Sequence, residues 1–201
     1  MRRDAGFTLI EMVITLAVLA VICAVAAPRF ITPTTVRPYY AVRKMRTDVR
    51  YAQLLAMEQQ VPKISNPPRI CITFDAANNL YALRRETAVG SNVWTYLSHP
   101  ARVPNTISPA TPNSFEFVVK FNSPTYRRAY QGAVISAVSL GNAAPSVIFD
   151  NAGSPFRSTG VGANVCKGGP VALADGSYVE INSHARLTFR AQTGEVDIVN
   201  V

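Results

Sequence analysis

The N-terminal part of the chain begins with one long apolar run. Every side chain of residues 7–27 is uncharged and apolar or small, except that of Glu11. An α-helix of these 21 residues is about 31 Å long, which matches the hydrocarbon thickness of a bilayer. The pattern therefore predicts a membrane-spanning helix over residues 7–27.

A second helical pattern follows residues 29–38, a stretch with Pro33 and Pro38 that is expected to break the helix. Within residues 39–60, apolar side chains recur every three or four positions, as is typical of a helix with one buried face. They are Val42, Met45, Val49, Ala52 and Ala56. We expect this helix to continue the axis of the first after a joint disrupted by proline, and to pack its apolar stripe against a sheet.

From residue 62 onward, short β-type runs alternate with turn residues. The expected strands are residues 69–74, 80–86, 93–97, 114–121, 133–140, 146–149, 171–174, 178–182, 185–191 and 195–199. Residues 75–79, Asp175-Gly176 and Thr193-Gly194 each predict a hairpin turn between the flanking strands. The predicted fold class is α+β: a long N-terminal helix, then a mostly antiparallel sheet domain of about eight to ten strands.

Glu11 makes the apolar run unusual. A carboxylate inside a membrane-spanning segment costs on the order of 3 kcal/mol on insertion scales, and no Lys or Arg lies within the run. A secretory signal or a plain single-pass anchor also fits basic residues followed by an apolar run, but neither explains the acid. We expect the partner of Glu11 to come from another chain, which points to assembly.

The first eleven residues resemble a known processing signal. Residues 2–6 (RRDAG) followed by residues 7–11 (FTLIE) are similar to the class III leader and mature N-terminus of type IV pilins and type II secretion pseudopilins. The resemblance implies that prepilin peptidase cleaves after Gly6 and N-methylates Phe7. It also implies that Glu11 pairs with the new terminal amine of a neighbouring subunit during assembly.

The same resemblance implies an organisation, a location and partners. Its expected parts are a leader over residues 1–6, a transmembrane and assembly helix over 7–28, a periplasmic continuation over 29–60, and a globular β-rich pilin-like domain over 61–201. The chain would cross the bacterial inner membrane once, with its C-terminal domain in the periplasm, before it enters a pilus or pseudopilus. The implied partners are other pilin or pseudopilin subunits, the prepilin peptidase/N-methyltransferase and the inner-membrane assembly platform.

Two looser motifs narrow the resemblance. Arg50-x-Ala52-Gln53 in the second helix and Phe149-x-x-x-Gly153 near the strands are similar to segments of the GspH/FimT group of minor pilins. Residues 27–30 and 40–43 additionally resemble minor pilins of mannose-sensitive haemagglutinin-type systems. The expected function is that of a minor pilin or pseudopilin.

The three cysteines have different expected roles. Cys23 lies in the apolar run, where it is expected to act as a small packing residue. Cys71 and Cys166 fall in the part that the anchor would place in an oxidising periplasm. A disulfide between them would contribute roughly 4 kcal/mol in the chain-entropy model, but their spacing does not show whether the two Cα atoms come close.

The formal net charge of +8 permits attraction to nucleic acid, anionic lipid or acidic partners. The second helix carries part of it, on Arg43, Lys44, Arg46 and Arg50, either as a solvated surface or as a contact face. Residues 126–130 (YRRAY) interleave aromatic rings with Arg127 and Arg128, which suits phosphate pairing and base stacking. DNA binding during DNA uptake is therefore the alternative function, and an exposed, solubilising loop is the other interpretation.

Catalytic signatures are missing from the sequence. It contains no Gly-x-Ser-x-Gly elbow, phosphate loop or His-Glu-x-x-His, and its two histidines, His99 and His184, do not have zinc-ligand spacing. We therefore expect a structural subunit without a cofactor or metal, not an enzyme.

Overall fold

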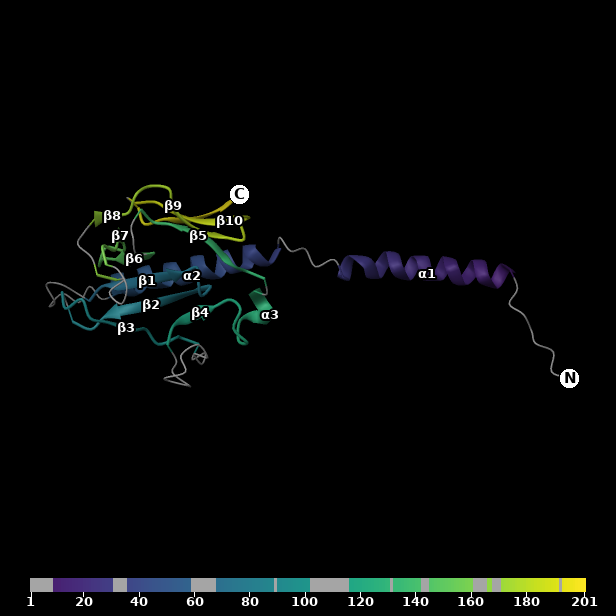
Figure 1. The fold of residues 1–201 in the computed structure, drawn as a ribbon, viewed down its shortest axis with the longest axis horizontal. Coiled ribbons are helices and arrows are strands. Elements are labelled where there is room, and N and C mark those ends of the chain that lie inside the picture. Colours follow the sequence, from purple (N-terminus) through teal and green to yellow (C-terminus); the bar gives the residue numbers. More distant parts are fainter. Residues whose placement is uncertain are drawn as a thin grey trace. The chain divides into compact units, whose positions relative to one another are not determined.

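The computed structural model describes residues 9–30, 36–58, 68–88, 90–101, 116–130, 132–141, 145–160, 166–167, 171–191 and 193–201. The chain forms two compact units, Met1–Thr34 and Thr35–Val201. The first contains the helix α1 (Leu9–Phe30), and the second, called the head below, contains all the other elements (Figure 1).

Helix α1 ends later than the sequence predicts. It includes Pro28 and ends at Phe30, so residues 29 and 30 are helical and do not belong to the expected break. A proline has a φ compatible with a helix but lacks the N–H for one bond and crowds the carbonyl four residues earlier, and α1 nevertheless continues through Pro28 for two more residues. Residues 7 and 8, the predicted start of the helix, lie outside the described residues.

Helix α2 (Val36–Glu58) begins earlier than the predicted residue 39. Pro38 therefore lies in its first turn, where the backbone N–H groups have no intrahelical partner and a missing N–H costs little. The expectation that Pro38 ends a broken stretch was wrong for this reason. Residues 59 and 60 are not among the described residues.

The described strands form two sheets. The strands are β1 (Ile70–Asp75), β2 (Leu80–Glu86), β3 (Trp94–Tyr96), β4 (Val118–Lys120), β5 (Ile135–Ser139), β6 (Ser146–Phe149), β7 (Pro155–Arg157), β8 (Val171–Ala172), β9 (Ser177–Ile181), β10 (Ala185–Phe189) and β11 (Val196–Asn200). The first sheet has the order β3-β2-β1-β6-β7-β8, with β4 also paired to β2, and the second has the order β11-β10-β9-β5. Every pairing between these strands is antiparallel, which confirms the α+β fold class.

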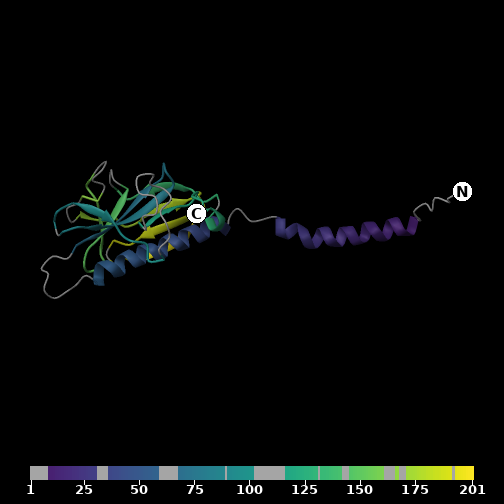
Figure 2. The ribbon, with the colours of Figure 1, turned by 90° about the horizontal axis from the view of Figure 1, so that it is seen from below.

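The core of the head lies between α2 and both sheets. All five residues of the predicted apolar stripe are buried, so that prediction is confirmed. Helix α2 contacts β1 and β6 of the first sheet and β9, β10 and β11 of the second, and Figure 2 shows it running along the sheets. Side chains such as Leu83, Phe149 and Leu187 meet it from the strands. Burying a side chain of this size contributes about 1.5–3 kcal/mol, so α2 is held by packing.

Two of the three predicted hairpins form. Residues 75–79 join β1 to β2, with Asp75 opposite Leu80, and Thr193-Gly194 joins β10 to β11, with Phe189 opposite Val196. These two predictions are confirmed.

The hairpin predicted at Asp175-Gly176 is wrong, although the turn itself forms. Gly176 has φ +79°, yet β8 pairs with β7 in the first sheet while β9 pairs with β10 and β5 in the second. The turn therefore carries the chain from one sheet to the other. The Asp175 carboxylate accepts a hydrogen bond from the backbone N–H of Ala191 at 2.8 Å. An Asp-Gly pair specifies a local turn geometry and leaves the pairing of the flanking strands open.

Gln53 of α2 joins two turns that are far apart in the sequence. Its Nε2 donates to the carbonyl oxygen of Gly194 at 2.5 Å and to that of Gly153 at 3.4 Å. Both glycines have positive φ, +66° and +77°. The two loose motifs, Arg50-x-Ala52-Gln53 and Phe149-x-x-x-Gly153, thus meet in one joint, which we call the Gln53 joint.

Replacing Gly194 with alanine is expected to destabilise the head by about 2–4 kcal/mol, from the left-handed backbone and from overpacking. A Cβ at Gly194 would lie 2.8 Å from the Gly153 oxygen and 2.9 Å from Nε2 of Gln53. The matched control is Gly176→Ala, because Gly176 also has positive φ but a Cβ there would meet nothing within 4 Å. Denaturant unfolding of the two variants measures the difference, and equal losses would show that the joint is not tightly packed.

Candidate functional site

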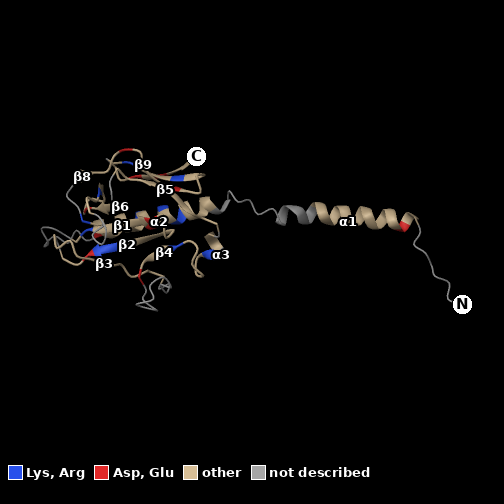
Figure 3. Ribbon diagram, viewed as in Figure 1, with Lys and Arg blue, Asp and Glu red and all other residues tan. Residues whose placement is uncertain are grey.

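Among the side chains of α1 that the structure describes, apolar residues lie on all sides and Glu11 is the charged one. Glu11 lies in the first turn of this helix, and in Figure 3 the first turn of α1 carries an acid while the remaining coloured part of the helix carries no charge. The exposed large apolar side chains are those of Leu9, Ile10, Met12, Val13, Ile14, Leu16, Val18, Leu19, Val21 and Ile22. A helix of this kind requires an apolar environment. Among the helices as far as they are described, none meets the length and hydropathy needed to cross a membrane.

The processing residues precede α1. Gly6 and Phe7, predicted for cleavage and N-methylation, lie outside the described residues, so the structure adds nothing to those predictions. Glu11 follows Phe7 by four positions, which is about one helical turn. An acid in the first turn is also favoured by the positive end of the helix dipole.

The head buries a different acid, Asp48 of α2, which is paired with Tyr81 and Lys44. Asp48 is 5% exposed, accepts a hydrogen bond from the Tyr81 hydroxyl at 2.5 Å, and forms a salt bridge with Lys44. Burial raises the pKa of Tyr81 well above its usual range, and the negative charge of Asp48 raises it further. Tyr81 therefore stays a protonated donor, and this cluster ties α2 to β2.

His99 sits beside this cluster and holds a fixed tautomer. Its Nδ1 accepts a hydrogen bond from the backbone N–H of Ala101 at 3.1 Å, so Nδ1 carries no proton. Its Nε2 lies 3.3 Å from the Tyr126 hydroxyl, and its ring lies 4.5 Å from that of Phe117. Burial lowers the pKa of His99, Lys44 lowers it further, and Asp48 opposes both. His99 is thus a neutral structural residue.

Lowering the pH from about 7.5 to about 5 is expected to destabilise the head through His99. The pKa of His99 in the folded head lies below the ordinary value of 6.5, so the unfolded chain takes up the proton first. Its contribution to stability is complete above 6.5 and is lost as the pH falls from 6.5 toward the folded-state pKa. Denaturant unfolding of the wild type and of His99→Gln at both pH values measures this loss. The variant should lose less stability on acidification, and equal losses would contradict the assignment.

The predicted DNA-binding residues fall on the short helix α3 (Arg127–Tyr130). Arg127 is exposed, and the side chain of Arg128 is not among those described. Tyr126 and Tyr130 are half-buried and pack on each other, with ring centroids 6.2 Å apart, and burial raises the pKa of Tyr126 to about 12. The two rings therefore contribute to the packing of the head. Neither ring is fully exposed, and base stacking by them stays a prediction.

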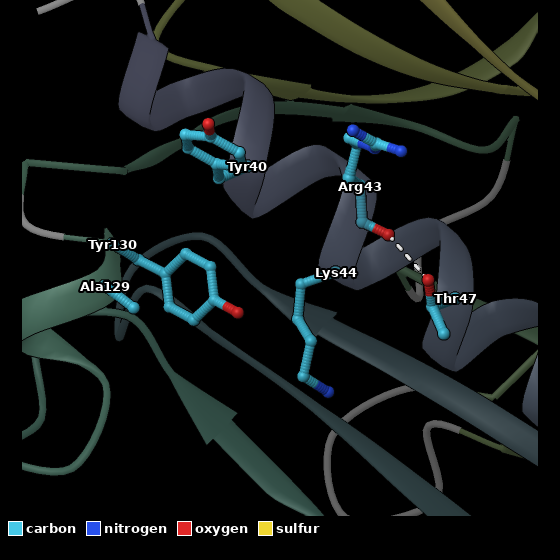
Figure 4. A pocket seen from close by; sticks show the side chains of 6 residues that line it. All are labelled: Tyr40, Arg43, Lys44, Thr47, Ala129 and Tyr130. Carbon is cyan, nitrogen blue, oxygen red and sulfur yellow. Dashed lines mark hydrogen bonds between the residues drawn. The ribbon is translucent and has the colours of Figure 1, made fainter.

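A pocket of about 370 Å³ opens between α2 and α3 (Figure 4). Tyr40, Arg43, Lys44 and Thr47 line it from α2, and Ala129 and Tyr130 line it from α3. Sequence reasoning missed this pocket, because no pattern in residues 126–130 indicates that they fold back against the start of α2.

The two cysteines of the head form a disulfide between Cys71 of β1 and Cys166, with Cα atoms 6.0 Å apart. It is buried and packs with Ile148, Trp94 and Phe156 on the face of the first sheet that lies away from α2. The bond attaches the chain around Cys166 to a central strand. Cys23 on α1 is free and exposed.

Comparison with known proteins identifies the N-terminal segment. Residues 1–27 match the family model of the prokaryotic N-terminal methylation motif. No curated protein and no solved structure gives a significant match to the chain. The matched segment contains the predicted cleavage site and Glu11. The chain thus carries a type IV pilin-like processing signal, and this signal supports a type IV pilin-type protein that prepilin peptidase processes.

Proposed function

We propose that this protein is a minor pilin or pseudopilin, a structural subunit of a type IV pilus or of a type II secretion pseudopilus, and not an enzyme. The observation that carries the proposal is the methylation motif over residues 1–27, with Glu11 in the first turn of a helix that is apolar on all sides. Residues 7–27 anchor the subunit in the inner membrane before assembly and pack in the filament core afterwards.

Cleavage after Gly6 creates the charge that Glu11 recognises. The new amine on Phe7 is a cation at the end of an apolar helix. Its attraction to a carboxylate is much stronger in a low-dielectric helix bundle than in water. Each subunit then offers one cation and one acid near the same helix end, so the pair sets the register between neighbouring helices. This pairing is how Glu11 recruits the subunit.

The Gln53 joint supports the finer assignment to the GspH/FimT group. The two motifs that resemble this group are separated by about a hundred residues in the sequence, yet Gln53 contacts Gly153 directly. Through this contact both motifs hold α2 against the turns that follow β6 and β10.

Gly6→Glu tests the processing step. A bulky acid in place of glycine before the scissile bond is expected to block cleavage, so the membrane fraction should contain only an uncleaved precursor with residues 1–6 still attached. Intact-mass measurement of the purified full chain reads this directly. Ala5→Ser is the matched control, because it changes the neighbouring residue with little added volume, and it should be processed normally. A processed Gly6→Glu chain would contradict the proposed cleavage site.

DNA binding remains the alternative prediction. Arg127 is exposed and available to phosphates, whereas Tyr126 and Tyr130 are engaged in packing. A gel shift of the full chain in detergent, across a salt series, tests it, since phosphate-driven binding weakens steeply as salt increases.

A further inference from the structure

We propose that the pocket between α2 and α3 binds the anionic headgroup of a membrane phospholipid and docks the head on the bilayer before assembly. This inference rests on the proposed membrane anchor and concerns a part of the chain outside the matched motif. Its evidence is the chemistry of the pocket and the place of the pocket in the sequence.

The pocket offers cations and hydroxyl groups to an anion. Arg43 is exposed, and among the described residues it lies in no salt bridge. Lys44 lies beside it, and Figure 4 shows Tyr130 extending toward Lys44 from the opposite wall. The described lining residues include no acid. An anion entering the pocket therefore meets cations and a phenol group, and no carboxylate among the described lining residues.

Asp48 offsets the charge of Lys44 but not that of Arg43. It is 5% exposed and already accepts hydrogen bonds from the Tyr81 hydroxyl and the Lys44 ammonium. Lys44 therefore brings little net charge, and Arg43 supplies the attraction. Lys44 contributes donors, because an ammonium has three and Asp48 does not use all of them.

Two exposed tyrosines lie at the start of α2, as is typical of a membrane–water interface; Tyr40 lines the pocket and Tyr39 lies beside Arg43. Tyr39 is 40% exposed and Tyr40 is 52% exposed, and the Arg43 guanidinium lies 5.8 Å from the centre of the Tyr39 ring. Tyrosine is enriched at the headgroup level of bilayers, where its ring meets apolar carbon and its hydroxyl meets water. Arginine beside it can reach lipid phosphates.

The pocket lies close in sequence to the proposed membrane anchor, and this is why we favour the membrane as its partner. Only residues 31–35 separate α1 from α2, and a connection of this length extends over at most about 20 Å. Residues 40–47 of α2 line the pocket, so in a chain whose α1 is held in a bilayer the short connection leaves the pocket within reach of the bilayer surface. Basic groups close to an anionic surface are attracted to it, and the attraction falls off within a Debye length.

The test places the full chain in lipid nanodiscs and measures whether a label at the pocket becomes less accessible to water. A nitroxide is attached at Thr47→Cys in a Cys23→Ala background, and its accessibility to a water-soluble nickel relaxant is measured by EPR. Discs of phosphatidylcholine alone are compared with discs that also contain phosphatidylglycerol. We expect protection of the label only with phosphatidylglycerol, and about a fivefold loss of the protected population in Arg43→Gln. A label at Leu54→Cys and the variant Arg50→Gln, both further along α2, should show no such change.

The possible outcomes distinguish a lipid headgroup from other ligands of the pocket, and they distinguish failure of the docking inference from failure of the membrane anchor. A label that stays equally water-accessible in both lipids overturns the docking inference, while recovery of the chain in the disc fraction still supports the anchor. Chain that does not enter discs at all contradicts the anchor itself. Protection in phosphatidylcholine discs only after an oligonucleotide is added would assign the pocket to nucleic-acid phosphate, and protection that increases with the number of chains per disc would assign it to another subunit. Either result overturns the lipid assignment.

Discussion

Replacing Glu11 with alanine is expected to remove the subunit from assembled filaments while leaving it in the membrane. Loss of one partner of a buried, hydrogen-bonded charge pair costs about 2–5 kcal/mol, and each ~1.4 kcal/mol changes an association constant tenfold. Insertion should not suffer, because removing an acid from an apolar segment is favourable by on the order of 3 kcal/mol. Immunoblots of sheared filaments and of membranes, quantified as a ratio, measure the effect.

Two further variants separate charge from shape. Glu11→Gln keeps the side-chain size and should fail almost as badly, because the amine of Phe7 then faces a neutral amide. Thr15→Ala is the matched control one turn further along α1, where the hydroxyl only donates to the Met12 carbonyl oxygen of the same helix. It should assemble normally. Wild-type levels of Glu11→Ala in filaments would contradict the recruiting role of the acid.

Removing the disulfide is expected to cause the largest loss of stability in the head. Cys71 and Cys166 are 95 positions apart, and a closed loop of that length contributes about 4–5 kcal/mol in the chain-entropy model. Cys71→Ala with Cys166→Ala should therefore unfold at much lower denaturant concentration. Trp94, the single tryptophan, packs beside the disulfide, so its fluorescence reports unfolding at this place.

The free cysteine supplies the control for the disulfide. Cys23→Ala changes a thiol of α1 that forms no disulfide, and its unfolding curve for the head should match that of the wild type. Addition of a reductant should destabilise the wild type toward the double variant and leave the double variant unchanged. Equal stability of the wild type with and without reductant would contradict the structural role of the bond.

The helices and most strands could be predicted because their signals are local. The stripe from Val42 to Ala56 follows the helical period and is buried as that period requires. Strands β2 and β6 have the predicted bounds, because apolar residues dominate both segments. Residues 29, 30 and 36–38 were assigned wrongly, since α1 continues past Pro28 and Pro38 lies in the first turn of α2, where its missing N–H costs little.

Other features depend on contacts between distant segments. The sequence shows a turn cluster over residues 150–155 but no strand after it, and β7 forms there because β6 and β8 pair with it on both sides. The strands flanking Asp175-Gly176 separate into two sheets for the same kind of reason. The pocket between α2 and α3 requires Tyr130 to pack near Lys44, which no periodicity encodes. The signal that could have indicated it is the gathering of tyrosines and basic residues at 39–44 and 126–130.

The most direct test of the account is the N-terminal mass of the protein isolated from cells that assemble it. Peptide mass spectrometry should find a mature chain that begins at Phe7 and carries one added methyl group on its amine. A chain that still begins at Met1, or one that is trimmed beyond residue 27, would contradict the account, because neither would offer Glu11 of a neighbouring subunit the cation that assembly requires.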